Sequence, residues 1–232
     1  MGHTLPVDPD VAYRRLQQRL DRMPTGAPDS AVFRRILRLL FTEEQAELAA
    51  RMPTMCTMAQ LAHRTGRSVE QLGPVVDDMA RKGLVFDLEH EGTRWVSLAP
   101  VVIGFFEFTF MRVREDVPID ELAELFDEYL FKDGRLAHAV FRGSTQIGRS
   151  LVREESLPDE PAVEVLDWEL ATHIVAEAPS VAVGNCPCRQ HAELMGHGCG
   201  APLRTCLSFG SAADALVRAG PVSYTHLRAH ET

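Results

Sequence analysis

Residues 58–85 read MAQLAHRTGRSVEQLGPVVDDMARKGLV, and this stretch decides the fold of the first half of the chain. Its apolar residues recur at helical spacing on both sides of Gly66, which predicts a short helix before that glycine and a longer helix after it. Ser68 suits the N-cap of the second helix, and Gly83 follows its last basic residues, where a helix typically ends. The stretch therefore encodes two helices joined by a tight turn.

The segments on either side extend this pattern. Residues 84–98 (LVFDLEHEGTRWVSL) alternate about a turn at Glu91-Gly92, which predicts a β-hairpin. Upstream, residues 31–40 and 42–52 carry apolar residues at the period of amphipathic helices. The last three of these helices, followed by a two-stranded hairpin, have the element order of a winged helix-turn-helix. Residues 31–98 resemble that family.

The resemblance implies a module that binds DNA through basic side chains on its second helix and hairpin. The candidate DNA contacts are Arg67, Arg81, Lys82 and Arg94. Acidic residues share both elements and would face phosphate, which weakens binding. We therefore favour a structural or protein-docking role for the module and keep nucleic acid as the alternative partner.

Net charge and hydropathy limit the classes of protein to which the chain can belong. The chain has 232 residues and a net charge of -9, whereas proteins that bind nucleic acid typically present a basic surface. Its N-terminus lacks the apolar core of a signal peptide, and its longest apolar run, residues 100–111, is too short to span a bilayer. We expect a cytoplasmic protein with no membrane span, in a compartment where clustered cysteines indicate metal or redox chemistry rather than disulfides.

Four of the five cysteines lie within 21 positions, in the run NCPCRQHAELMGHGCGAPLRTCLSFG (185–210). They are Cys186, Cys188, Cys199 and Cys206. Four thiolates are a complete ligand set for a tetrahedral zinc ion or for a 4Fe-4S cluster. One C-x-C pair and two isolated cysteines match the paired knuckles of a structural zinc site poorly, so we expect the cluster. Zinc, in a mixed site with His191 and His197, is the alternative.

Glycines and arginines surround these thiols in the sequence. Gly198 and Gly200 flank Cys199 and let the backbone bend tightly towards a cluster. Arg189 and Arg204 lie close to the ligands and would stabilise the negative charge of a 4Fe-4S centre. We therefore expect these four residues to surround the ligands and tune the centre.

Short elements are predicted around the cysteines. A strand over residues 162–166 and a helix from Asp167 precede a second strand, PSVAVGN, which runs directly into Cys186. After the last cysteine, Ser211 is a suitable cap for a helix that ends at Gly220.

The run CPCR, a glycine-rich loop with one cysteine, and the sequence P-x-x-x-C-L-x-F-G from Pro202 resemble a ferredoxin-type (4Fe-4S) iron–sulfur family with an N-terminal winged-helix-like region. The resemblance implies that the clustered cysteines bind the iron and that further cysteine-rich motifs follow the last helix. This chain instead ends VSYTHLRAHET (222–232), which resembles read-through of a sequencing adapter. We therefore expect the natural sequence to be truncated near Gly220.

The predicted fold class is α+β and mainly helical, with a winged helix-turn-helix, a helical connector and a small cysteine-rich metal domain. The predicted segments are an N-terminal helix (1–30), a winged-helix-like domain (31–112), a helical connector and linker (113–159), a cysteine-rich iron–sulfur domain (160–220) and an adapter-derived end (221–232).

The expected function is single-electron transfer between redox partner proteins, as an electron carrier or an oxidoreductase component. Two alternatives stay open: a redox- or iron-responsive winged-helix transcriptional regulator, and a zinc-stabilised interaction module. A stand-alone enzyme is less favoured because the sequence offers no catalytic motif. The glycine-rich run at 196–200, for example, lacks the Lys-Ser/Thr ending of a phosphate-binding loop.

Overall fold

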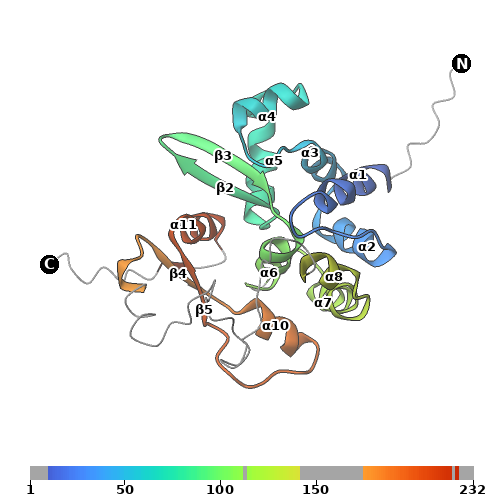
Figure 1. Ribbon diagram of the computed structural model, residues 1–232. Coiled ribbons are helices and arrows are strands. Elements are labelled where there is room, and N and C mark those ends of the chain that lie inside the picture. Colours follow the sequence, from blue (N-terminus) through green and yellow to red (C-terminus); the bar gives the residue numbers. More distant parts are fainter. Residues whose placement is uncertain (1–9, 112–113, 142–174, 221–222, 225–232) are drawn as a thin grey trace, which may run out of the picture.

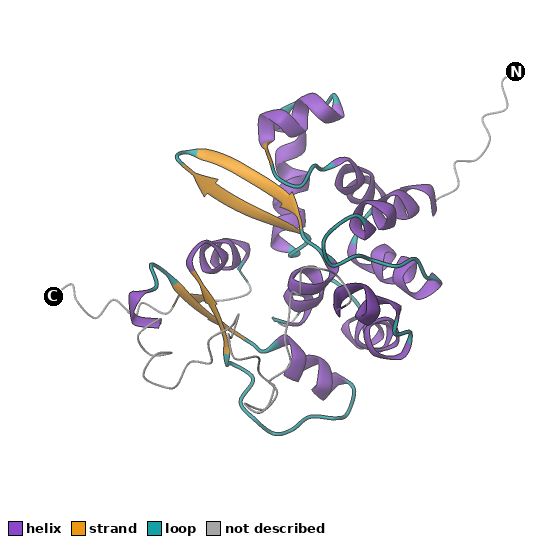
Figure 2. Ribbon diagram, viewed as in Figure 1, coloured by secondary structure: helices purple, strands orange, loops and turns teal. Residues whose placement is uncertain are grey.

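The computed structural model describes residues 10–111, 114–141, 175–220 and 223–224. These residues form mostly helices, together with two small antiparallel sheets (Figures 1 and 2). The predicted class, α+β and mainly helical, is therefore confirmed. Within these residues no helix is both long enough and apolar enough to cross a membrane.

Five helices form the N-terminal part, and side-chain caps set where they begin. Their bounds are α1 (Asp10–Asp21), α2 (Ala31–Leu40), α3 (Glu43–Arg51), α4 (Met58–Thr65) and α5 (Val69–Arg81). Ser30 caps α2, and Thr42, Thr57 and Ser68 form capping boxes at the starts of α3, α4 and α5. Because each box satisfies backbone donors that the first helical turn leaves unpaired, the predicted limits of these helices hold closely.

A three-stranded sheet follows α5, with its strands in the order β1-β3-β2. Its strands are β1 (Cys56–Thr57), β2 (Val85–His90) and β3 (Thr93–Leu98). Glu91 and Gly92 both adopt positive φ, 50° and 71°, which confirms the predicted hairpin turn. β1 was not predicted, because two residues are too few to show an alternating pattern; it pairs antiparallel with β3, where Cys56 lies opposite Val96.

The helices after the hairpin pack on the N-terminal ones. They are α6 (Phe106–Phe110), α7 (Ile119–Asp127), which continues in a wider π-helical turn to Lys132, and α8 (Arg135–Phe141). The Tyr129 ring stacks on Phe33 of α2 with centroids 4.6 Å apart, and its hydroxyl donates to the carbonyl of Pro28. One hydrophobic core thus runs from Ala12 to Val140, across the domain boundary predicted at residue 112.

The cysteine-rich segment forms a second, smaller layered unit. Its elements are β4 (Val181–Gly184), α10 (Pro187–Leu194), β5 (Cys206–Phe209), α11 (Gly210–Ala219) and β6 (Ser223–Tyr224), with strand order β5-β4-β6. α11 packs on β4, β5 and the hairpin strand β2 (Figure 1), and Arg218 pairs with Glu89 at 3.3 Å.

Two local expectations for this unit need comment. The helix near the end of the chain is present and ends at Gly220, but its N-cap is Phe209 rather than Ser211, with no side-chain cap. The strand predicted over residues 162–166 and most of the helix predicted from Asp167 lie outside the described residues.

Gly83 forms the tight turn that joins α5 to the hairpin. It adopts φ +73° after α5, where the N–H groups of Gly83 and Leu84 donate to the carbonyls of Ala80 and Met79. A Cβ at this position would lie 2.4 Å from the Cβ of Phe108, whereas a Cβ at Gly66, with φ +71°, would meet nothing within 4 Å.

We expect Gly66→Ala to lower the free energy of unfolding by about 1–2 kcal/mol, the cost of left-handed backbone. Gly83→Ala is expected to cost about 1–3 kcal/mol more, because the added methyl also overpacks against Phe108. Urea denaturation of both variants measures the difference. Equal losses would show that Phe108 does not press on this turn.

Candidate metal centre

The pairing of β4 with β5 brings two of the cysteines together. In the antiparallel register Cys206 lies opposite Gly184, and Cys186 follows two residues after Gly184. The N–H of Cys186 donates to the carbonyl of Leu203 at 2.7 Å, which extends the backbone pairing beyond the strands. The two thiols therefore emerge at the same end of the small sheet.

The start of α10 adds the third thiol. Cys186 is the N-cap residue, Pro187 is the first helical residue and Cys188 lies in the first turn. Proline suits this position because the N–H that it lacks has no partner inside the helix. The N-terminal end of a helix carries partial positive charge, which favours a nearby thiolate or other anion.

Three thiols interact with one another at this place. The side chains of Cys186 and Cys188 lie within hydrogen-bonding reach, and both interact electrostatically with Cys206. Cys188 is open to solvent on one side and backed by protein on the other. Partial burial raises the pKa of Cys188 and of Cys206, and the neighbouring charges of Cys186 and Glu107 raise both pKa values further. The site therefore disfavours negative charge unless a cation is bound.

Cys199, the fourth predicted ligand, lies apart. It is exposed, in a loop between α10 and β5, and within the described residues it takes no part in the interactions among the other three thiols. A Cβ at Gly196 or Gly200 would meet nothing within 4 Å, so both glycines border open space. In the described part of the chain no three donor side chains converge tightly enough to enclose an ion.

The glycines flanking Cys199 serve different purposes. Gly200 adopts φ +68°, which glycine does without strain. At Gly198 a Cβ would lie 2.9 Å from the Cγ of Glu193, so the loop passes close to α10 there. Gly198 therefore allows close packing on α10, a reason that the sequence analysis did not foresee.

Arg189 supports the loop that precedes Cys206. Its guanidinium donates to the carbonyl of Pro202 at 2.5 Å and to the hydroxyl of Thr205 at 3.0 Å. It thereby holds the chain next to the cysteine in place. Arg204 is exposed beside the same loop.

Glu107 of α6 faces this site and was missed as a site residue. Its carboxylate accepts the N–H of Gly104 at 2.8 Å, and it interacts electrostatically with Cys188 and Cys206. Burial raises its pKa, against the effect of the backbone donors of Gly104 and Ile103. The sequence signal for this residue is a lone carboxylate inside the apolar run at 100–111.

The turn that Glu107 holds is strained. Ile103 adopts φ +55°, although it is β-branched and its side chain is 57% exposed. Left-handed backbone costs a residue with a Cβ about 1–2 kcal/mol. The Glu107 carboxylate offsets this strain in part, because it accepts hydrogen bonds from the backbone N–H groups of Ile103 and Gly104.

His191, a candidate ligand of the mixed zinc alternative, is part of the hydrophobic packing. Its side chain is buried and its Nε2 atom lies 3.0 Å from the carbonyl oxygen of Ala123 in α7. Its ring meets those of Phe106 and Phe110 edge-on, with centroids 5.7 and 5.3 Å apart. His197 is exposed. The described geometry therefore gives the mixed site no support.

The four candidate DNA contacts all form ion pairs within the chain. Arg67 pairs with Glu44, Arg81 and Lys82 pair with Asp78, and Arg94 pairs with Asp77 and Asp87. The longest of these contacts is 3.0 Å, between Arg94 and Asp87. The structure thus neutralises these cations locally instead of presenting them as a free positive surface.

Comparisons of the chain with protein-family models, with characterised proteins and with solved structures find no match. The argument for function therefore depends on the site itself.

Substitution of His191 tests whether this residue attaches the cysteine-rich segment to the helical core. We expect His191→Leu to lower the free energy of unfolding by about 2 kcal/mol, because it removes a buried hydrogen bond and the edge-on ring contacts. His197→Leu, at an exposed position, is the matched control and is expected to leave stability unchanged. Urea denaturation measures both. Metal loss in His191→Leu at unchanged stability would instead identify His191 as a ligand.

Proposed function

We propose that the chain binds an iron–sulfur cluster of the 4Fe-4S type through Cys186, Cys188, Cys199 and Cys206. The observation that carries this proposal is the mutual approach of three thiols, Cys186 and Cys188 at the start of α10 and Cys206 on β5. Thiols that crowd together with raised pKa values gain most from a bound cation. Cys199 completes the ligand set from a loop in which Gly196 and Gly200 lie in open space, with no atom within 4 Å of an added Cβ.

The donor set favours iron–sulfur over zinc as the bound group. A mixed zinc site would use His191, but that ring is occupied by its contacts with Ala123 and two phenylalanines. Cysteine alone then remains, and one C-x-C pair with two separate cysteines suits a cluster with one thiolate per iron. The N-terminal end of α10 and the Arg189 guanidinium supply partial and full positive charge near a group of net negative charge.

Single-electron transfer between redox partner proteins is the function that we propose for this centre. When bound, a cluster of this type takes up and releases one electron. The position of the thiols at the surface supports this role, because Cys188 is exposed and a partner can approach closely. Leu207 and Phe209, on the outward face of β5, are 48% and 38% exposed and provide apolar contact area beside Cys206.

A cytoplasmic location is part of this proposal. All five cysteines are free thiols, including the pair Cys186 and Cys188 at the start of α10. Free clustered thiols are stable in a reducing compartment, where metal binding rather than disulfide formation is their usual use.

The order of elements in the N-terminal half favours a winged-helix module, but the ion pairs of its cations do not favour DNA binding. The order α2, α3, β1, α4, α5, β2, β3, with β1 beside β3, is the order expected of such a module. The cations predicted to contact DNA are all committed to ion pairs. We therefore propose a structural or protein-docking role for this half, rather than a transcriptional regulator.

Anaerobic purification followed by iron, sulfide and zinc analysis tests the cluster. We expect about four irons and four sulfides per chain, with a broad visible band that bleaches on reduction. Cys188→Ala and Cys206→Ala are expected to lose most of the iron. Cys56→Ala is the matched control, because that buried thiol lies in the other sheet, 3.8 Å from the carbonyl of Val96. Stoichiometric zinc without a visible band would overturn the redox function.

Duplex DNA binding, followed by fluorescence anisotropy at low salt, tests the role of the winged-helix cations. Arg81→Gln and Arg94→Gln are expected to leave any affinity for DNA unchanged, because both guanidinium groups are already paired. Stability is expected to fall by less than about 1 kcal/mol, as is usual for exposed ion pairs. A severalfold loss of affinity in either variant would restore the regulator as a candidate.

A further inference from the structure

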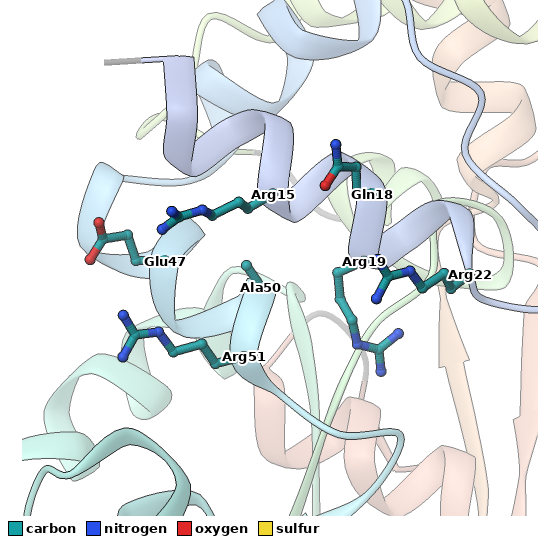
Figure 3. A pocket seen from close by; sticks show the side chains of 7 residues that line it. All are labelled: Arg15, Gln18, Arg19, Arg22, Glu47, Ala50 and Arg51. Atoms are coloured by element: carbon teal, nitrogen blue, oxygen red, sulfur yellow. The ribbon is translucent and has the colours of Figure 1, made fainter. Parts of the chain in front are cut away.

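A group of arginines gathers between α1 and α3, away from the cysteines. Figure 1 shows α1 and α3 on the opposite side of the molecule from α10 and β5. Arg15, Arg19 and Arg22 follow one another at four- and three-residue spacing, so they share one face of α1 and of the turn that follows it. Arg51 projects from α3, near Ala50. Together they line a groove of about 180 Å³ (Figure 3).

The lining of this groove carries more positive than negative charge. Within the described residues, Arg15, Arg22 and Arg51 form no ion pair and no hydrogen bond, and Glu47 is the one carboxylate in the lining. Arg14, next to Arg15 on the same helix, differs because it pairs with Asp10. On a chain with a net charge of -9, three such arginines around one groove are a specific feature of this face.

Arg19 shows how closely the charges are packed. It is half-buried, and its Nε atom donates to the carbonyl of Met52 at 2.8 Å, which fixes the guanidinium at the base of α3. Burial lowers the pKa of Arg19, and the charges of Arg22 and Arg64 lower it further. Like charges on neighbouring helical positions repel one another, so a bound anion would stabilise this arrangement.

The chemistry of the groove points to phosphate. Guanidinium groups bind phosphate oxygens through paired, charge-assisted hydrogen bonds, and the amide of Gln18 adds a further donor on the same face. Among the described residues no aromatic side chain lines the groove, so they provide no stacking surface of the kind that a nucleic-acid strand uses. Its small volume suits a pair of phosphate groups, and the net negative charge of the chain disfavours a duplex.

We propose that this groove binds the phosphate groups of a small polyphosphate, the class that includes inorganic pyrophosphate and the nucleoside diphosphates. Arg15 and Arg51 contact the anion from one side of Ala50, and Arg22 contacts it from the other, with Arg19 held between α1 and α3. The small side chain of Ala50 leaves the space that the anion occupies (Figure 3). The site is separate from the cysteine cluster and does not depend on a metal.

Isothermal titration calorimetry of the whole chain with pyrophosphate and with ADP, at low ionic strength in a buffer free of phosphate, tests this proposal. Saturable binding of pyrophosphate is expected, weakened roughly tenfold by each of Arg15→Gln, Arg22→Gln and Arg51→Gln. Arg14→Gln is the matched control and is expected to bind as the unchanged chain does. Equal affinities would identify the diphosphate itself as the ligand, and tighter ADP binding would identify a nucleotide.

Thermal unfolding provides an independent measurement on the same variants. Because the three arginines lack partners among the described residues, their glutamine variants are expected to fold with unchanged midpoints. Pyrophosphate is expected to raise the midpoint of the unchanged chain and of Arg14→Gln by more than that of the three variants. Absence of saturable pyrophosphate binding would overturn the proposal. So would equal weakening in Arg14→Gln, or binding of duplex DNA but not of pyrophosphate.

Discussion

The packing of His191 between α6 and α7 joins the cysteine segment to the helical core. Its buried ring lies edge-on to Phe106 and Phe110, and its Nε2 atom faces the carbonyl oxygen of Ala123. His191 stands three residues after Cys188, on the same face of α10, so this contact fixes the end of the helix at which the thiols lie. The position of the candidate metal centre against Glu107 therefore depends on an aromatic contact that involves no cysteine.

The second constraint is the close approach of four acidic groups, three thiols and one carboxylate, which repel one another when they are ionised. The β4–β5 register places Cys206 near Cys186, the start of α10 adds Cys188, and α6 adds Glu107. Burial and the charges of Cys186 and Glu107 raise the pKa of Cys188 and of Cys206, which disfavours their ionised form. A cation bound among the thiols would favour their ionised form instead. This dependence distinguishes the cluster from Cys56, whose thiol is packed in the core against β3.

Local signals predicted the N-terminal half well. Ser68 caps α5 as predicted, and Glu91-Gly92 forms the turn of the hairpin. β1 and α10 were missed, because a two-residue strand and an eight-residue helix that starts at Pro187 have too little periodicity.

For the candidate site, the sequence predicted four thiol ligands, three of which the structure brings together, but not the contacts made by the groups around them. The partners of Arg189, the packing of Gly198 against Glu193 and the approach of Glu107 all join residues distant in the chain or set by loop geometry. The ion pairs of Arg67 and Arg94 are likewise tertiary, and they remove the free charge that the sequence suggested. The groove of arginines between α1 and α3 could not be predicted from the sequence, because it forms only where the two helices pack together.

Electron paramagnetic resonance of the anaerobically purified chain, reduced with dithionite, tests the cysteine cluster as an iron–sulfur centre most directly. We expect the signal of a reduced 4Fe-4S cluster, integrating to about one spin per chain. A chain that gives no such signal and carries stoichiometric zinc or no metal would contradict the proposed centre.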